Sequence, residues 1–201
     1  MTRLGIFGGT FDPPHLGHLI LAAEAQAQLG LERVLWVLTP FPPHKTGQDV
    51  TPLADRLDLL AAALDDDLAF ELCRVDIDRP PPHYAVDTVG LLRALYPQAH
   101  LVYLIGGDSL SDLPLWHRPA DFILACDEIG VMLRPGHVMD LDVLEARLPG
   151  LRLRTRLIRA PLLEISSSDL RRKIAQGRPF RYYLPQPVYQ LISDRLLYQD
   201  G

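Results

Sequence analysis

The sequence predicts an α/β fold with a doubly wound, mostly parallel sheet of the Rossmann-like type. Short apolar runs typical of strands covered on both faces alternate with longer segments in which leucine and alanine recur at helical spacing. Three clusters rich in glycine or serine mark passages from a predicted strand to a predicted helix. Because parallel strands end at one edge of such a sheet, we expect these clusters to face a common crevice.

The composition is that of a globular protein, and we predict a single domain over residues 1–201 with a helical C-terminal portion from about residue 166. Apolar residues make up 48% of the chain and charged residues 22%. A net charge of −5 argues against a binder of nucleic acid or of membrane surfaces. The chain enters its first strand without an apolar leader, so we expect a cytoplasmic protein whose cysteines, Cys73 and Cys126, are reduced.

The first cluster joins a buried strand at residues 4–7 to a helix that starts near Leu16. Gly8 and Gly9 form the turn, and Gly30 stands where a helix ends in a left-handed residue. The spacing of the apolar positions predicts one buried face on this helix, made of Leu16, Leu19, Ile20, Ala23 and Ala27.

His15 and His18 are three positions apart, so they project from neighbouring positions on the first turn of this helix. Unpaired backbone N–H groups and the positive end of the helix dipole point the same way, which predicts a site for an anion such as phosphate. A zinc site would need a third protein ligand, and a dinucleotide site would need the pattern G-x-G-x-x-G, which residues 10–14 interrupt. Both alternatives are weaker than the phosphate site.

A basic loop follows the next strand. The continuous apolar run at residues 34–38 predicts a strand buried on both faces. The loop at residues 41–49 places His44 and Lys45 beyond the C-terminal end of this strand, where open α/β sheets bind ligands. A plain solvated loop is the alternative, and the first cluster makes a cation for phosphates the better interpretation.

Two helices and a strand are expected between this loop and the second cluster. Thr51 is predicted to cap a helix that buries Leu53, Leu57, Leu60, Ala61 and Leu64. A strand at residues 70–77 and an irregular proline-rich segment follow. The next helix is predicted at residues 85–96.

The second cluster is the tetrad Gly-Gly-Asp-Ser at residues 106–109, directly after a strand at residues 100–105. Glycines let a ligand lie against the backbone, and the carboxylate of Asp108 suits hydrogen bonds to ribose hydroxyls. A turn in which Asp108 or Ser109 caps a helix is the alternative. Trp116 either covers the edge of the core or stacks on an aromatic ligand.

The third cluster lies near the C-terminus, after a strand at residues 128–133, a helix at 140–148 and a strand at 151–159 in which leucine alternates with arginine. We expect that arginine face to be solvated and not to contact RNA. Serines before Leu170 predict a helix start that could also hold phosphate, with Arg171 in its first turn. Basic residues there need an anion, because the helix dipole disfavours them. The tail beyond them is expected only to pack.

The stretch GGTFDPPHLGH at residues 8–18 resembles the signature G-G-T-F-D-P-x-H-x-G-H of the nucleotidyltransferase superfamily. Nearly the whole chain resembles the family of bacterial nicotinate-nucleotide adenylyltransferases, through Trp116 and the motifs FPPHK, IGGDS, RPG, ISSSDLR and LPQPV, at residues 41–45, 105–109, 134–136, 165–171 and 184–188. The resemblance implies transfer of the adenylyl group of ATP to nicotinate mononucleotide, with Mg²⁺ as cofactor and pyrophosphate as second product.

The resemblance also implies a role for each site residue. The catalytic groups would be His15, His18, Lys45 and Arg171. ATP would be bound by Gly8, Gly9, Thr10, Phe11, His15, His18, Gly106, Asp108, Ser166, Ser167, Ser168 and Arg171. Nicotinate mononucleotide would be bound by Asp12, His44, Lys45, Tyr84, Ala85, Thr88 and Trp116. Mg²⁺ is expected on the phosphates of ATP, with no metal ligand from protein side chains.

One departure from the family concerns the pyridine pocket. Where the family tends to read S-Y-T-x-x-T, residues 83–88 read HYAVDT, so Ala85 has lost a hydroxyl and keeps its backbone N–H. An adenylyltransferase that prefers nicotinamide mononucleotide or phosphopantetheine therefore stays open, as does a non-catalytic module that binds ATP. The expected partners are ATP and nicotinate mononucleotide, with no nucleic acid and no membrane, and a homo-oligomer is left open.

Overall fold

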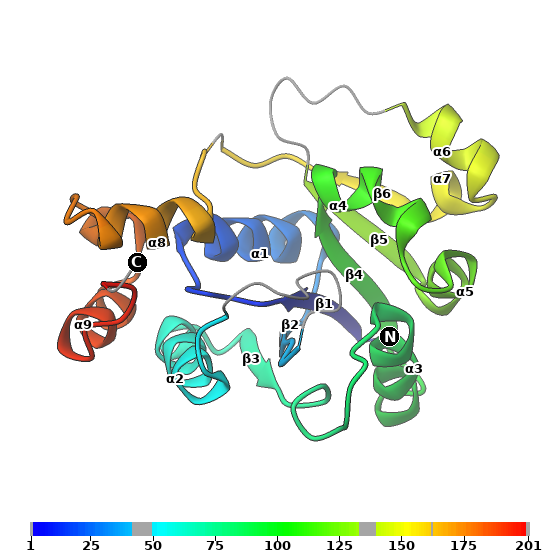
Figure 1. Cartoon of the computed structure of the whole chain (residues 1–201). Coiled ribbons are helices and arrows are strands. Elements are labelled where there is room, and N and C mark those ends of the chain that lie inside the picture. Colours follow the sequence, from blue (N-terminus) through cyan, green and yellow to red (C-terminus); the bar gives the residue numbers. More distant parts are fainter. Residues whose placement is uncertain (1, 42–49, 133–139, 162, 200–201) are drawn as a thin grey trace.

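The computed structural model describes residues 2–41, 50–132, 140–161 and 163–199. At its centre is a six-stranded sheet whose neighbouring strands are all parallel (Figure 1). Across the sheet, β3-β2-β1-β4-β5-β6 are Phe70–Cys73, Arg33–Leu38, Arg3–Gly9, His100–Gly106, Glu128–Met132 and Thr155–Ile158. The order turns back on itself between β1 and β4, and it confirms the predicted doubly wound α/β fold.

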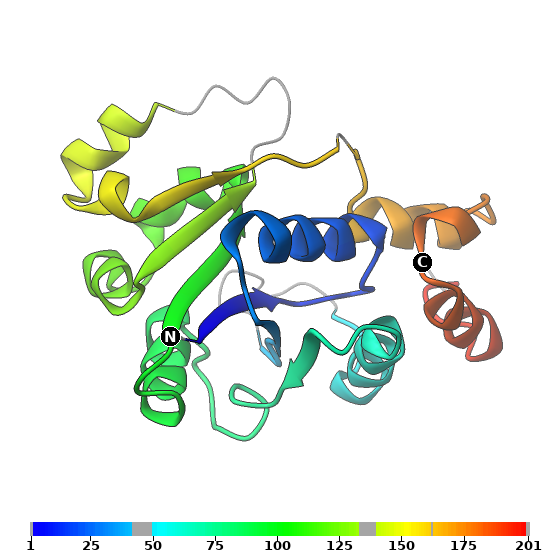
Figure 2. The ribbon, with the colours of Figure 1, turned by 180° about the vertical axis from the view of Figure 1, so that it is seen from behind.

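Helices cover both faces of the sheet, as the turned view also shows (Figure 2). The α-helices of the described residues, α1 to α9, are Leu16–Leu29, Leu53–Leu64, Ala85–Leu95, Gly107–Ser111, Pro119–Ala125, Leu141–Arg147, Leu151–Arg154, Ser167–Ala175 and Gln186–Asp194. Leu4 and Ile6 of β1 join a buried cluster with α3 and α5, whereas Phe7 joins a second cluster with α1 and α2. Because both faces are buried, the strand reads as a continuous apolar run.

The two C-terminal helices, α8 and α9, pack on α2. A third buried cluster joins Leu59 and Ala63 of α2 to Leu170, Ile174, Val188 and Ile192. Both views place α8 beside the start of α1 (Figures 1 and 2). The packing therefore brings a helix from the end of the chain to the first glycine cluster.

The first helix, α1, buries a different face from the predicted one. Leu21 and Ala25 are buried, whereas Ala23 and Ala27 of the predicted face are exposed. Alanines lie on several sides of this helix, so the apolar pattern alone does not fix its rotation. The predicted end is confirmed, because Gly30 is left-handed with φ of +59°.

The segment predicted as one strand over residues 151–159 divides into a helical turn, α7, and the strand β6. The carboxylate of Glu145 accepts hydrogen bonds from the N–H of Gly150 at 2.8 Å and of Arg152 at 2.7 Å. Gly150 has φ of +91°, so the chain turns there. A helical turn of four residues is too short to show its period, which is why the alternation misled the prediction.

Two further boundaries differ from the prediction. Strand β3 ends at Cys73 instead of residue 77, because the N–H of Asp78 donates to the carbonyl oxygen of Arg74 at 3.0 Å and turns the chain. The N-cap position of α2 is held by Pro52, without a side-chain cap, and not by Thr51.

Both cysteines are free thiols, as predicted. Burial raises the pKa of the Cys126 thiol, which makes it a poor nucleophile. Within the described ranges, no helix has the length and apolar character that crossing a membrane requires.

Candidate active site

Aromatic packing shapes the turn after β1. Phe11 has a left-handed backbone, with φ of +46°, which residues with a side chain seldom adopt. Its ring packs edge-on against Phe7, with centroids 5.5 Å apart. A Cβ on Gly9 would lie 2.8 Å from the Phe11 ring, and one on Gly8 would lie 2.7 Å from the hydroxyl oxygen of Tyr103. The protein's own packing therefore already requires both glycines, and the approach of a ligand to them stays a prediction.

The two histidines form the start of α1. His15 is the N-cap residue and is 5% exposed, whereas His18 is half-buried. The backbone N–H of His15 donates to Nδ1 of His18 at 3.2 Å, and the rings stack with centroids 3.6 Å apart. Because Nδ1 of His18 accepts a hydrogen bond, the proton of the neutral ring lies on Nε2, which can donate to a ligand.

The start of α8 contacts the turn before α1. Nη1 of Arg171 donates to the backbone carbonyl oxygen of Asp12 at 2.7 Å, and Oγ of Ser167 donates to that of Pro13 at 2.9 Å. Arg171 is the fifth residue of α8, one turn later than predicted, and its side chain is 28% exposed. The structure thus brings Arg171 to the turn that carries the histidines, as the sequence predicted.

The three serines before Leu170 have different surroundings. Oγ of Ser166 accepts from the N–H of Asp169 at 3.1 Å and donates to its carboxylate at 2.9 Å, so it caps α8. The hydroxyl of Ser167 donates to the carbonyl oxygen of Pro13. Ser168 is exposed and lines a cavity of about 570 Å³ together with Arg171. The hydroxyls of Ser166 and Ser167 therefore hold α8 in place, and phosphate binding by the serines and their backbone amides stays a prediction.

Asp12, which we predicted to contact the substrate, is buried beneath the site with an exposed fraction of 2%. Its Oδ2 accepts from the N–H of Thr51 at 3.3 Å, and its Oδ1 accepts from the hydroxyl of Tyr198 at 2.9 Å. Nη1 of Arg171 lies 3.8 Å from Oδ2. The prediction that the tail only packs is therefore wrong, because Tyr198 reaches the first cluster.

Arg56 is the site residue that the sequence analysis missed. It is 2% exposed and donates four hydrogen bonds to backbone carbonyl oxygens, those of Thr51 at 2.8 Å, Thr10 at 3.1 Å, Thr39 at 3.0 Å and Pro40 at 2.8 Å. Burial lowers the pKa of its guanidinium, an effect that the neighbouring carboxylate of Asp12 opposes. An arginine within an otherwise apolar helix face was the available signal.

The second cluster lies at the end of β4, next to the first cluster at the end of β1. Ile6 of β1 is in register with Tyr103 of β4, so Gly9 and Gly106 end neighbouring strands at the point where the strand order turns back. A Cβ on Gly106 would have no atom of the described residues within 4 Å, so the space above it is open. Asp108 is exposed in the first turn of α4. The strand passes straight into α4, whose N-cap is Gly106 without a side-chain cap, so neither Asp108 nor Ser109 caps this helix as the alternative required.

Two aromatic side chains predicted to bind the pyridine ring lie near the start of α3. Tyr84 is the N-cap residue of α3, Ala85 is its first residue, and the Tyr84 ring stacks on His117 with centroids 4.0 Å apart. The ring of Trp116, the residue before His117, packs on the Phe122 ring with centroids 5.2 Å apart. Trp116 therefore covers the core edge and lies next to the residue that stacks on Tyr84.

Thr88, which we predicted to contact the substrate, is buried with an exposed fraction of 2%. Its hydroxyl donates to the carboxylate of Asp76 at 2.9 Å, and Arg79 donates to the same carboxylate at 2.8 Å. This network holds the proline-rich segment against α3. Nearby, His83 is 5% exposed, and neither of its ring nitrogens has a hydrogen-bond partner in the described part of the chain.

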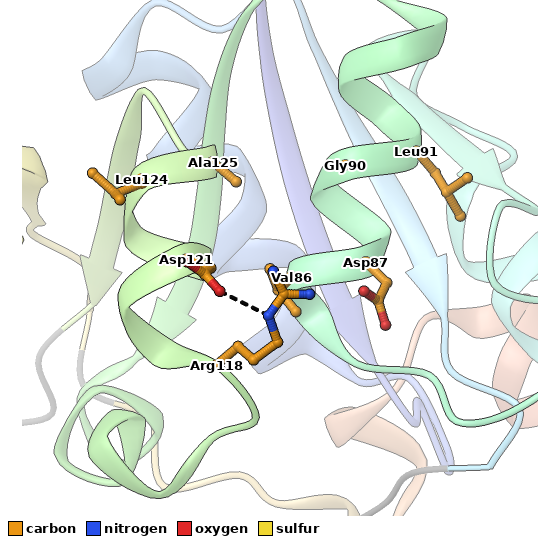
Figure 3. Close-up of a pocket in the computed structure, with 8 residues that line it drawn as sticks. All are labelled: Val86, Asp87, Gly90, Leu91, Arg118, Asp121, Leu124 and Ala125. Atoms are coloured by element: carbon orange, nitrogen blue, oxygen red, sulfur yellow. Dashed lines mark hydrogen bonds and ion pairs between the residues drawn. The ribbon is translucent and has the colours of Figure 1, made fainter.

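His44 and Lys45, which belong to the predicted site, and the RPG motif lie outside the described residues. A groove of about 560 Å³ between α3 and α5 is lined by Arg118 and Asp121, which form an ion pair at 2.7 Å, and by Val86, Asp87, Gly90, Leu91, Leu124 and Ala125 (Figure 3). None of the predicted site residues lines this groove.

A helix N-terminus at the point where the strand order of a parallel sheet turns back is where α/β proteins bind nucleotide phosphates, and His15 and His18 lie at such a helix start here. A family model described as cytidylyltransferase-like matches residues 6–173, a span that runs from β1 into α8. The fold, the site and this match together define a nucleotidyltransferase.

Known proteins specify the class further. A probable nicotinate-nucleotide adenylyltransferase of Thermomicrobium roseum is 48% identical over 99% of this chain and 92% of its own length. A second one, of Roseiflexus sp., is 42% identical over 98% of both chains. The solved nicotinic acid mononucleotide adenylyltransferase of Plasmodium falciparum, complexed with NaAD, has a TM-score of 0.83 over 100% of this chain and 99% of its own at 17% identity, which bears on the fold alone. The chain belongs to the family of nicotinate-nucleotide adenylyltransferases.

Proposed function

We propose that this chain transfers the adenylyl group of ATP to nicotinate mononucleotide, giving nicotinate adenine dinucleotide and pyrophosphate. The names of its relatives support this reaction. The observation that carries the proposal is the hydrogen bond from Arg171 to the backbone of Asp12. It joins a cation from α8 to the turn that presents His15 and His18, so that one triphosphate can contact all three side chains.

The chemistry is an in-line displacement. A phosphate oxygen of the mononucleotide attacks the α-phosphorus of ATP, a P–O bond forms, the bond to the oxygen that bridges to the β-phosphate breaks, and pyrophosphate leaves. Since no protein nucleophile takes part, the site works by positioning and by stabilising charge. His18 donates through Nε2 to a phosphate oxygen, and His15 donates beside the positive end of α1.

Arg171 stabilises the charge that develops on the leaving pyrophosphate. Its bond to a neutral carbonyl leaves the positive charge for an anion, and Ser168 and the backbone amides at residues 166–168 add donors at the start of α8. Lys45 serves as a mobile cation near the reacting groups. The hydroxyls of Ser166 and Ser167 take part only by holding α8 in place.

The adenosine of ATP occupies the opening between β1 and β4. Asp108 accepts hydrogen bonds from ribose hydroxyls, and the open space at Gly106 lets the nucleotide lie against the backbone. On the side of β1, the backbone at Thr10 and Phe11 borders the nucleotide.

The nicotinate ring lies between Tyr84 and Trp116, with its carboxylate at the backbone N–H of Ala85, where the positive end of α3 favours an anion. This N–H survives the loss of a hydroxyl at position 85, and it gives the nicotinate carboxylate an advantage over the neutral amide of nicotinamide. His44 borders the mononucleotide from the loop after β2. Thr88 and Asp12 act from below the surface, by fixing the segments that carry these groups.

Mg²⁺ arrives with ATP and is bound by its phosphates. Among the residues that the structure describes, no group of three or more His, Cys, Asp or Glu side chains is placed to hold a metal ion. When bound, the ion neutralises phosphate charge. The protein's own part is to orient that phosphate chain with His15, His18 and Arg171. We place the reaction in the cytoplasm.

The test is to incubate the purified protein with ATP, Mg²⁺ and one acceptor at a time, and to follow the release of pyrophosphate. The acceptors are nicotinate mononucleotide, nicotinamide mononucleotide and phosphopantetheine. Turnover that is fastest with the first is expected. Silence with all three would refute the enzyme and leave a module that binds ATP, and a preference for either of the others would refute the assigned substrate.

A further inference from the structure

The tail after α9 returns to the turn that precedes α1. Leu196 and Tyr198 have left-handed backbones, with φ of +53° and +64°. At the end of this path the hydroxyl of Tyr198 donates to Oδ1 of Asp12 at 2.9 Å, across 186 positions of sequence. This hydrogen bond ties the segment after α9 to the signature stretch.

The described residues that donate hydrogen bonds to the Asp12 carboxylate do so through neutral groups. Besides Tyr198, the N–H of Thr51 donates to it at 3.3 Å. Nη1 of Arg171 stays 3.8 Å from Oδ2 and donates to the backbone carbonyl of Asp12 at 2.7 Å. A buried carboxylate needs hydrogen-bond donors. The hydroxyl of Tyr198 donates a hydrogen bond to Asp12 that the guanidinium of Arg171 would otherwise have to donate. Burial raises the pKa of Tyr198, so the hydroxyl keeps the proton that it donates.

We infer that Tyr198 is a positioning residue for the transfer: its hydroxyl satisfies Asp12 and so keeps Arg171 directed toward the phosphates of ATP. This inference rests on the role proposed for Arg171. Tyr198, Arg171 and Ser168 line the same cavity of about 570 Å³, so a shift of the guanidinium toward Asp12 is a shift away from that opening. Removing the hydroxyl leaves Oδ1 short of a donor and draws Arg171 into a close ion pair with Asp12.

The experiment is a double-mutant cycle that combines Tyr198→Phe with Arg171→Ala. Tyr198→Phe keeps the ring and removes only the hydroxyl. We expect it to lower kcat/KM for pyrophosphate release about tenfold, the loss typical of one hydrogen bond to a charged group. In the Arg171→Ala background the same change should lower kcat/KM less than about twofold, because there is no guanidinium left to misdirect. Tyr189→Phe, in α9, is the matched control and should keep wild-type turnover.

A purely structural role gives a different pattern. An equal loss from Tyr198→Phe in both backgrounds, or unchanged turnover in a folded Tyr198→Phe protein, would overturn the inference. The affinity for ATP, measured at equilibrium on the same proteins, provides a readout that needs no turnover. If the wild-type protein releases no pyrophosphate, the proposed function fails, and the inference still stands or falls on whether Tyr198→Phe weakens ATP binding only when Arg171 is present.

Discussion

The guanidinium of Arg171 and the backbone carbonyl oxygen of Asp12 lie 2.7 Å apart although 159 positions separate them in the sequence. The acceptor is the neutral carbonyl, and the carboxylate of Asp12 is farther away, at 3.8 Å. A cation held in this way is fixed in place without losing its charge to a close ion pair. The relationship explains how a helix near the C-terminus can complete the phosphate site that we propose at the end of the first strand.

Replacing Arg171 should therefore reduce catalysis without unfolding the protein. We expect Arg171→Ala to lower kcat for pyrophosphate release by about 10² to 10³, the range for removing one charge-stabilising donor. Arg171→Lys should be intermediate, because lysine keeps the charge and loses the planar fork. Arg172→Ala is the control, since that side chain is 68% exposed and pairs with Asp169. Equal losses from the alanine variants of Arg171 and Arg172 would contradict the assignment.

The two histidines should respond differently to replacement. His18→Ala removes a donor from a half-buried ring, so turnover should fall about 10²-fold or more while the thermal midpoint stays close to that of the wild type. His15→Ala also removes the buried N-cap residue of α1, so it should lower turnover and cost about 1 kcal/mol of unfolding free energy. Calorimetry and pyrophosphate release separate the two effects. An unchanged rate in His18→Ala would remove its catalytic role.

The sequence predicted those parts of the molecule whose cause is local. Buried strands, the left-handed end of α1 at Gly30 and the start of α8 at the serines before Leu170 each follow from a few neighbouring residues. The convergence of Arg171 on the first cluster was also predictable, because parallel strands end at one edge of the sheet. The rotation of α1 was not, since alanines on several sides leave it to tertiary packing.

A single contact between residues that are far apart in the sequence leaves no sequence pattern that identifies both partners. The hydroxyl of Tyr198 reaches Asp12 across 186 positions, and nothing near Tyr198 in the sequence indicates that target. Arg56 left one signal, an arginine within an apolar helix face, but its four acceptors are backbone carbonyls, which have no sequence signature. Such contacts are found only when the fold is known.

Arg56 should be the most sensitive of these positions for stability. Arg56→Met leaves four buried or partly buried carbonyl oxygens without their donor, and we expect a loss of roughly 3 kcal/mol or more in unfolding free energy. Urea denaturation measures this loss. Arg74→Ala is the matched control, since its side chain is 51% exposed and pairs with Asp78 at the surface; it should cost no more than about 0.5 kcal/mol. Similar losses at the two positions would contradict the importance of the carbonyl network.

His83 should make the stability of the protein depend on pH. Burial lowers the pKa of its imidazole from the ordinary value of 6.5 in the folded state, whereas the unfolded chain keeps the ordinary value. As the pH falls below 6.5, the unfolded state binds a proton first, so folding stability contributed by His83 is complete above 6.5 and decreases toward the lower folded-state pKa.

Replacing the imidazole tests this dependence directly. His83→Leu should flatten the fall in unfolding free energy between pH 7.5 and pH 5.5, measured by urea denaturation, because the variant has no proton to take up at this position. His117→Leu is the control, since it removes the imidazole of an exposed residue. Because Asp76 favours the charged imidazole, Asp76→Asn should steepen the same slope by leaving burial less opposed. Equal slopes of unfolding free energy against pH in the wild type and in His83→Leu would show that the buried imidazole does not cause the loss of stability at acid pH.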